Sequence, residues 1–158
     1  VGRDGRLFRM VKFRSMSVGA EAHTHEFAAR NEGAGPLFKL KSDPRVTRVG
    51  AFLRKYSLDE LPQFWNVLTG DMSAVGPRPP LPSEVNAYDG TVYRRLYIKP
   101  GITGLAQVSG CRGETPGIEE MKARIDYDLD YLRHWSPALD LKILVRTARL
   151  LFNDTRAY

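Results

Sequence analysis

Two adjacent carboxylates, Asp59 and Glu60, lie in the stretch LRKYSLDELPQFWNVLTGDMSAVGPRP at 53–79. A carboxylate near the start of a helix can coordinate Mg²⁺ or attack phosphorus as a nucleophile. Such an attack brings two negative charges together, and at ~4 Å with an effective dielectric near 20 their repulsion is about 4 kcal/mol. Arg54 and Arg78 could each clamp a phosphate through two N–H groups. The stretch therefore predicts a site for phosphate chemistry.

The same two acids also fit an ordinary role at the start of a helix. The run SLDE matches the capping box, in which Ser57 bonds the first-turn backbone and Glu60 reaches back. Pro62 complicates this interpretation, because in a helix capped by Ser57 it would remove a hydrogen bond past the first turn. If the helix begins near Asp59 instead, Pro62 falls among the N–H positions that have no partner within the helix. Both placements put the carboxylates at the mouth of a helix.

The arginine at position 78 stands between two prolines, Pro77 and Pro79. A lone surface arginine is usually only solvated, but here the prolines stiffen the backbone beneath it. Residues 76–117 are rich in proline and glycine and are expected to run as turns and extended backbone. Rigid, irregular backbone of this kind often surrounds a ligand site.

The composition is that of a folded, basic domain. The 158 residues carry a net charge of +6 and a sequence pI near 9.6, so we expect one catalytic or binding domain over 1–158 with an anionic partner. Nucleic acid, an acidic bilayer and a phosphorylated small molecule all fit the charge. No run approaches the ~18 apolar residues of a spanning helix. No Gly-rich nucleotide loop of the P-loop or Rossmann type is present.

Apolar spacing predicts two long helices near the C-terminus. The first begins after Thr115 and Pro116, with apolar residues every three or four positions up to Leu132. The second begins at Ser136 and Pro137, and its wide apolar face is rimmed with cations. A helix lying in a membrane interface and an ordinary core helix both fit that face.

Nearer the N-terminus, residues 7–14 mix apolar and basic types and predict a strand or short hairpin, with Lys12 among its basic residues. Within DELPQFWNVL a short helix is expected to bury one apolar stripe and to stop at Gly70. That stripe comprises Leu61, Phe64, Trp65 and Leu68. The expected fold class is α+β, predominantly helical, with a small β element and C-terminal amphipathic helices.

Three motifs resemble one known family. They are KFRSM at 12–16, the stretch at 53–79 described above, and KPGITGLAQVSG at 99–110. Together they strongly resemble the bacterial polyprenyl-phosphate glycosyl-1-phosphate transferases, the bacterial sugar transferase family. The resemblance runs from residue 1 almost to residue 158. It implies a compact monotopic membrane enzyme that moves a sugar 1-phosphate from a UDP-sugar to undecaprenyl phosphate and releases UMP.

The resemblance also implies roles for individual residues. Asp59 would be the nucleophile that forms a phosphosugar–aspartyl intermediate, and Glu60 would lie beside it at the Mg²⁺ site. The residues that would bind substrate phosphate are Arg54, Arg78 and Lys12. The candidates for a further substrate or metal contact are Asp128 and Pro77.

The segment CRGETPGIEEMKARIDYDLDYLRHWSPALDLKI at 111–143 resembles glucose-1-phosphate transferases that initiate exopolysaccharides. Glucose 1-phosphate is therefore the expected group transferred. The resemblance implies an upstream membrane anchor, which is missing from this chain, and a place at the cytoplasmic face of the bacterial inner membrane. No nucleic acid is expected as a partner. The alternative function from charge and helix pattern is a non-catalytic basic module at a membrane surface.

Overall fold

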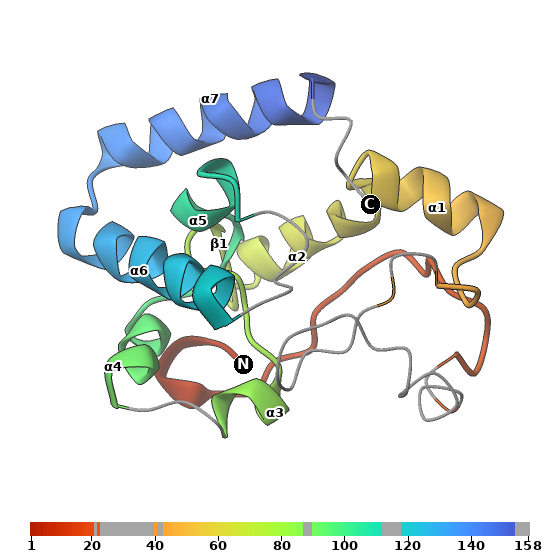
Figure 1. Ribbon diagram of the computed structural model, residues 1–158, viewed down its shortest axis with the longest axis horizontal. Helices are drawn as coiled ribbons and strands as arrows, with labels where there is room; N and C mark the ends of the chain where they lie inside the picture. The colour runs from red at the N-terminus through yellow and green to blue at the C-terminus, as the bar shows by residue number, and fades with distance from the viewer. Residues whose placement is uncertain (21, 23–39, 41–42, 87–89, 112–117, 154–158) are drawn as a thin grey trace.

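The computed structural model describes residues 1–20, 22, 40, 43–86, 90–111 and 118–153. Within these residues the chain is mostly helical, and two short strands form a small parallel sheet (Figure 1). The helices are η1 (Arg3–Gly5), α1 (Arg48–Lys55), η3 (Leu58–Glu60), α2 (Gln63–Leu68), α3 (Pro82–Val85), α4 (Gly90–Tyr93), η4 (Arg94–Tyr97), α5 (Leu105–Val108), α6 (Ile118–His134) and α7 (Pro137–Asn153), where η marks a 3₁₀ helix. The strands are β1 (Ser73–Val75) and β2 (Gly101–Thr103).

Strand β2 lies within residues 76–117, where turns and extended backbone were expected, and β1 lies just before that segment. Strands β1 and β2 pair in parallel, with Ser73 opposite Gly101. Their backbones approach so closely that a Cβ atom added at Gly101 would lie 2.1 Å from the backbone nitrogen of Gly76. Glycine is therefore required at position 101, because any side chain there would push the two strands apart.

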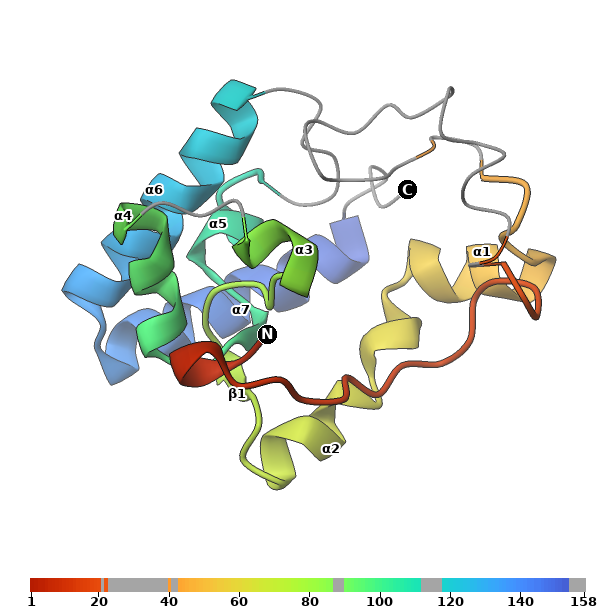
Figure 2. The same ribbon diagram turned by 90° about the horizontal axis from the view of Figure 1, so that it is seen from below.

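The strand expected over 7–14 is wrong. This segment is extended but makes no sheet ladder, and the isolated bridge near it joins Met16 to Val46. Figure 2 shows the N-terminal segment running from the neighbourhood of α4 and β1 to α1. Individual hydrogen bonds to side chains and turns hold this segment, where a neighbouring strand would otherwise do so. These hydrogen bonds matter for the site described below.

The core forms where the long helices cover the sheet. Val75, Tyr131 and Ile143 are buried together, and they come from β1, α6 and α7 respectively. Helix α7 crosses above α5 and the sheet, with α6 beside them (Figure 1). Ser136 begins the last helix as expected, because its hydroxyl accepts a hydrogen bond from the N–H of Leu139 at 3.2 Å.

Helix α2 presents the opposite face to that expected. All four residues of its apolar stripe are exposed, with Trp65 63% accessible, whereas the polar residues Gln63 and Asn66 are buried. Gly70 follows the helix with φ +85°, as the stop signal predicted. The expectation that α2 buries its apolar stripe is therefore wrong, since the interior requires the hydrogen-bonding groups of its other face.

Helix α7 has apolar residues on both sides. Ile143 is almost fully buried, while Leu141, Leu144 and Val145 are exposed. The helix therefore contributes to the core and also leaves an apolar face uncovered. Among the described residues, no helix combines the length and the apolar character needed to cross a membrane.

Candidate functional site

The two adjacent carboxylates lie on a single turn of 3₁₀ helix, η3. Ser57 precedes this turn in the left-handed conformation, with φ 54°, and its side chain makes no capping hydrogen bond to the helix. Pro62 occupies the position just before α2, where it has no intrahelical bond to break. The capping bond predicted for the Ser57 side chain is therefore absent.

Lys12 lies directly against this turn, although it is distant in sequence. Its Nζ donates to Glu60 Oε1 at 2.9 Å, and both side chains stay partly exposed. The next residue, Phe13, donates its backbone N–H to the carbonyl oxygen of Asp59 at 3.0 Å. The structure thus brings together three of the residues that the sequence analysis singled out: Lys12, Asp59 and Glu60.

A buried asparagine holds the strand-like segment that carries Lys12. Asn66 accepts a hydrogen bond from the Val11 N–H at 2.9 Å and donates one to the Arg9 carbonyl at 2.8 Å. Its side chain therefore takes the place of a neighbouring strand for this segment, immediately before Lys12. The sequence analysis did not single out Asn66, because neither its residue type nor its spacing marks a buried amide.

Helix α1 positions Arg54 from the other side. The helix begins at Thr47, whose hydroxyl accepts a hydrogen bond from the Gly50 N–H at 2.9 Å. Gly50 packs so tightly on the backbone of Ser15 that no side chain could fit between them. In return, the Ser15 hydroxyl accepts a hydrogen bond from Arg54 Nε at 2.9 Å. Ser15 belongs to the KFRSM motif, but its role could not be deduced from residue type.

These contacts define what we call the carboxylate site: Lys12, Ser15, Arg54, Asp59 and Glu60. Burial and the neighbouring charge of Glu60 raise the pKa of Asp59 above its ordinary value, while Lys12 and Arg54 act in the opposite direction. The two cations therefore favour the ionised form that a nucleophile or a metal ligand requires.

The donor set of this site fits a magnesium ion. Mg²⁺ prefers oxygen ligands and usually binds through one or two protein carboxylates together with substrate phosphates and water. Asp59 and Glu60 supply two adjacent carboxylates, and the repulsion between them is what a divalent cation would offset. Over the described part of the chain, no three acidic, histidine or cysteine side chains gather as a closed metal cage.

Arg78 belongs to a different group of charges. Its side chain is exposed, whereas Pro77 beneath it is buried. The charges that act on Asp59 are those of Glu60, Lys12 and Arg54, and Arg78 is not among them. The structure therefore does not join Arg78 to the carboxylate site by a direct contact within the described residues.

Asp128 lies in the group of charges that includes Arg78. Its carboxylate is 2% exposed and forms an ion pair with Arg95, whose Nη2 is 2.6 Å away. Burial raises the pKa of Asp128 to about 6, against the opposing effect of Arg95 and Arg124. We call this second group the arginine corner: Arg78, Arg95, Arg124 and Asp128. Sequence reasoning named Arg78 and Asp128 but missed the two arginines that accompany them.

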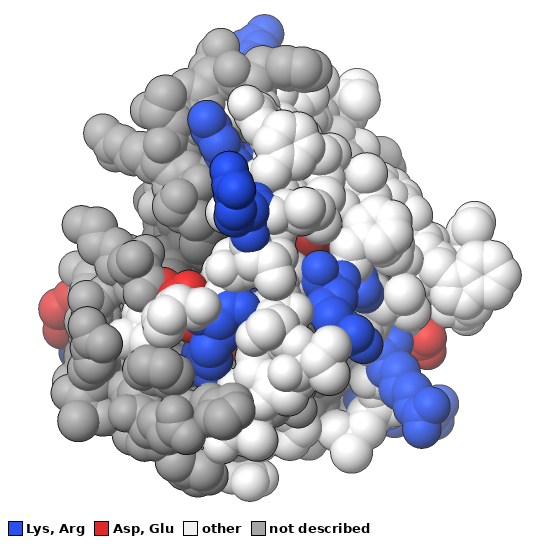
Figure 3. Space-filling model, turned by 90° about the vertical axis from the view of Figure 1, so that its right-hand side faces the viewer, with Lys and Arg blue, Asp and Glu red and all other residues white. Residues whose placement is uncertain are grey.

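The surface around α1 is basic. Figure 3 shows this side of the molecule, where lysine and arginine side chains lie across the middle of the face and carboxylates show only in small patches between them. A phosphate-bearing ligand approaching this face would meet a favourable field.

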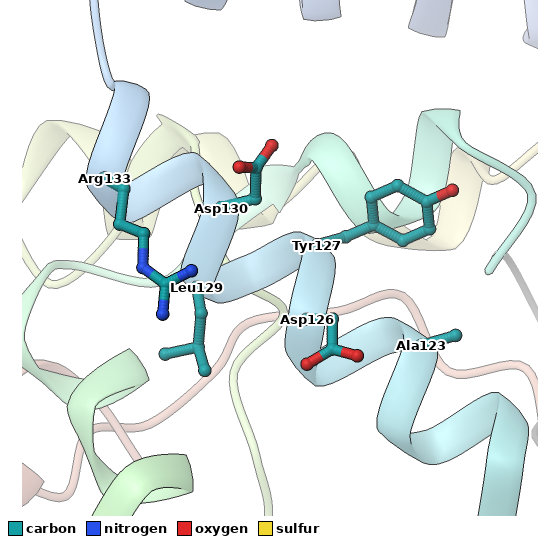
Figure 4. Close-up of a pocket in the computed structure, with 6 residues that line it drawn as sticks. All are labelled: Ala123, Asp126, Tyr127, Leu129, Asp130 and Arg133. Atoms are coloured by element: carbon teal, nitrogen blue, oxygen red, sulfur yellow. The ribbon is translucent and has the colours of Figure 1, made fainter.

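A separate hollow of about 470 Å³ runs along α6 (Figure 4). The described residues that line it come from this one helix and include Asp126, Asp130 and Arg133. None of the residues singled out from the sequence lines it. The hollow is therefore distinct from both charged groups.

Comparisons with known proteins agree on one family. The model of the family described as "Bacterial sugar transferase" matches residues 1–154. A UDP-glucose:undecaprenyl-phosphate glucose-1-phosphate transferase from Xanthomonas campestris pv. campestris is 49% identical over 160 residues, which cover 99% of this chain and 31% of that protein. The galactosyl transferase CpsE of Streptococcus agalactiae is 48% identical over 157 residues, covering 99% and 34%.

An undecaprenyl-phosphate galactose phosphotransferase from Salmonella typhimurium is 44% identical over 162 residues, covering 100% of this chain and 33% of that protein. The chain thus spans about a third of the length of these relatives. Their printed names include both glucose and galactose as the sugar.

Proposed function

The chain belongs to the bacterial sugar transferase family, and on that premise we propose that it transfers a sugar 1-phosphate from a UDP-sugar to undecaprenyl phosphate and releases UMP. This step would begin the synthesis of an exopolysaccharide or a capsule. The observation that carries the proposal is the meeting of Lys12 and Glu60 beside Asp59, across 48 residues of sequence. Such a cluster of opposite charges, half open to solvent, suits a phosphate ligand.

In the proposed mechanism Asp59 is the nucleophile. Its carboxylate oxygen attacks the phosphorus that carries the sugar, a new P–O bond forms, and the bond from that phosphorus to the oxygen of UMP breaks. UMP leaves with the bonding electron pair. An oxygen of undecaprenyl phosphate then attacks the same phosphorus, and the carboxylate of Asp59 departs unchanged.

The cations of the site would lower the barrier by opposing the negative charge that gathers. Lys12 and Arg54 lie where they favour the ionised Asp59, and both can donate hydrogen bonds to phosphate oxygens. Ser15 would hold the guanidinium of Arg54 in the right place. A magnesium ion held by Asp59 and Glu60 would supply further charge neutralisation when bound.

We propose glucose as the sugar, since several relatives are named for it. The galactose named for others makes UDP-galactose the necessary comparison. UMP release should therefore be measured with each UDP-sugar separately, in the presence of undecaprenyl phosphate and Mg²⁺. A preference for UDP-galactose would correct the sugar and leave the class of reaction intact.

We further propose that the chain works at the cytoplasmic face of the bacterial inner membrane, where the lipid substrate is held. Two observations support contact with a bilayer: the exposed apolar stripe of α2 and the uncovered apolar side of α7. Apolar and aromatic side chains presented beside a basic surface suit an interface with anionic lipid. Binding to vesicles that contain phosphatidylglycerol should weaken when Trp65 is replaced by Ser.

The activity is tested directly with the protein in lipid vesicles, supplied with UDP-glucose, undecaprenyl phosphate and Mg²⁺. Release of UMP is expected, and the variant Asp59→Asn should release none above background. If no UDP-sugar yields UMP while the vesicles still bind the protein, the activity is wrong and a non-catalytic membrane-surface module takes its place. Full activity of Asp59→Asn would reject the assigned nucleophile alone.

A further inference from the structure

The backbone of Arg78 is held on both sides, while its side chain remains exposed. The carbonyl of Pro77, just before it, accepts a hydrogen bond from the Gly101 N–H at 2.8 Å. The carbonyl of Arg78 itself accepts one from Arg95 Nη2 at 3.2 Å. These hydrogen bonds fix the position of the Arg78 backbone. The exposed side chain can still place its guanidinium against a ligand.

The donor that holds the Arg78 carbonyl is part of a buried ion pair. The side chains of Arg95 and Asp128 are 4% and 2% exposed, and Arg95 Nη2 lies 2.6 Å from Asp128 Oδ2. Arg95 comes from η4 and Asp128 from α6, and these two elements pack against each other. One guanidinium nitrogen therefore links the carboxylate on α6 to the loop that carries Arg78.

Asp128 also moderates repulsion among the arginines. Arg124 lies one helical turn before it on α6 and donates a hydrogen bond to the Cys111 carbonyl at 2.9 Å. Burial, then the charges of Arg78 and Arg95, lower the pKa of Arg124, and Asp128 acts in the opposite direction. The carboxylate thus helps three like charges to remain close together.

On the basis of the proposed function, we propose that Asp128 and Arg95 are positioning residues that fix where the guanidinium of Arg78 meets a phosphate of the UDP-sugar. Asp128 is too deeply buried to touch that phosphate itself, so its influence on the substrate passes through Arg95 and the Arg78 backbone. The pair consequently acts on substrate affinity, and its effect depends on the presence of the Arg78 side chain.

A double-mutant cycle in the vesicle-bound protein tests this dependence. Asp128→Ala and Arg78→Gln are made singly and together, and KM for the UDP-sugar and kcat are measured from UMP release. Each single variant should raise KM about tenfold, and the double variant should raise it no more than about threefold beyond Arg78→Gln. A purely structural role for Asp128 would lower the active fraction, and therefore kcat, without changing KM.

The matched control is Asp126→Ala, which removes an exposed carboxylate from the same helix. Its KM should equal that of the unsubstituted protein. If Asp128→Ala is unfolded at the assay temperature, Asp128→Asn replaces it in the cycle, because it keeps the volume of the side chain and removes the charge that holds Arg95. An unchanged KM in either single variant, or effects that multiply to about a hundredfold in the double variant, would overturn the proposal.

Failure of the proposed function gives a different result. In that case the unsubstituted protein releases no UMP from any UDP-sugar, whatever the variants do. The dissociation constant for UDP then becomes the readout of the same cycle, and equal values throughout the series overturn the positioning role.

Discussion

The carboxylate site and the arginine corner contain the same kinds of charged groups but use them in opposite ways. In the carboxylate site Lys12 and Glu60 pair at 2.9 Å while both remain partly open to solvent. In the arginine corner Arg95 and Asp128 pair at 2.6 Å in the interior, Arg124 is partly exposed, and Arg78 is exposed. In the partly exposed pair, either side chain can release the other and bind a ligand. The buried pair is inaccessible to any ligand.

The groups that hold each region differ accordingly. Neutral groups position the charges of the carboxylate site: the amide of Asn66 and the hydroxyl of Ser15. In the arginine corner an ion pair is itself the support. A buried ion pair is a weak source of stability but a specific one, since its geometry admits few alternatives. Two opposite charges that lie close together therefore indicate a ligand site only if their side chains are also exposed to solvent.

The largest effect should come from removing the proposed nucleophile. Asp59→Asn keeps the size of the side chain but cannot attack phosphorus, so UMP release should fall by roughly a thousandfold or more. The melting temperature should stay the same or rise, because burial already disfavours the charge at this position. The same substitution at exposed Asp126 is the control. Retained UMP release by a folded Asp59→Asn protein would contradict the assigned role.

The next largest effect should be the loss of protein stability when the buried ion pair is broken. Arg95→Ala leaves Asp128 buried without its main counter-charge, so the free energy of unfolding should fall by about 3 kcal/mol or more. Lys12→Met breaks the partly exposed pair and should change it by less than about 1 kcal/mol. Urea denaturation measures both, with Arg94→Ala as the exposed control from η4. If Arg95→Ala and Lys12→Met lower the free energy of unfolding equally, the buried pair and the partly exposed pair do not differ as proposed.

A smaller effect is expected from the neutral support of the carboxylate site. Asn66→Ala removes two hydrogen bonds to the segment before Lys12 and should lower the free energy of unfolding by about 1–2 kcal/mol. UMP release should fall about tenfold, because Lys12 loses its fixed position. Asn86→Ala, at an exposed helix end, should change neither quantity.

The dependence on Lys12 is checked by combining substitutions. In a Lys12→Met background, Asn66→Ala should have little further effect on UMP release. An undiminished tenfold effect in that background would show that Asn66 acts by another route.

The last expected effect is a slope of stability with pH that arises in the arginine corner. The pKa of Asp128 is about 6 in the folded protein, above the ordinary value of 3.8, so between these values the folded state binds the proton more tightly than the unfolded state. The free energy of unfolding should therefore fall as the pH rises from about 4 to 6, and this contribution should level off above that window. Asp128→Asn should lack it. Melting curves that run parallel for the two proteins across this range would contradict the assignment.

The parts of the fold that the sequence predicted are those with long local patterns. Helices α6 and α7 repeat apolar residues every three or four positions, and Ser136 begins the second of them as expected. The helix start predicted at Thr115 and Pro116 lies outside the described residues. The strands could not be predicted, because each has only three residues and their pairing joins segments far apart in sequence.

The charged members of the carboxylate site were predicted, but the neutral groups that position them were not. The stretch at 53–79 indicated Arg54, Asp59 and Glu60, and the family resemblance added Lys12 from the KFRSM motif; the structure brings all four together. The sequence did not predict the roles of Asn66 and Ser15, because a buried amide or hydroxyl has no distinctive residue type or spacing. The face of α2 was assigned wrongly for a related reason: burying apolar residues is the usual rule, and here the need to satisfy a neighbouring backbone prevails.

The meeting of Lys12 with Glu60 across 48 residues has a consequence for synthesis of the chain. Every member of the carboxylate site, and the asparagine that supports it, has been translated by residue 66, so these parts can assemble while the rest is still emerging from the ribosome. The arginine corner must wait for Asp128. The residues that would perform the chemistry therefore leave the ribosome before those that would orient Arg78.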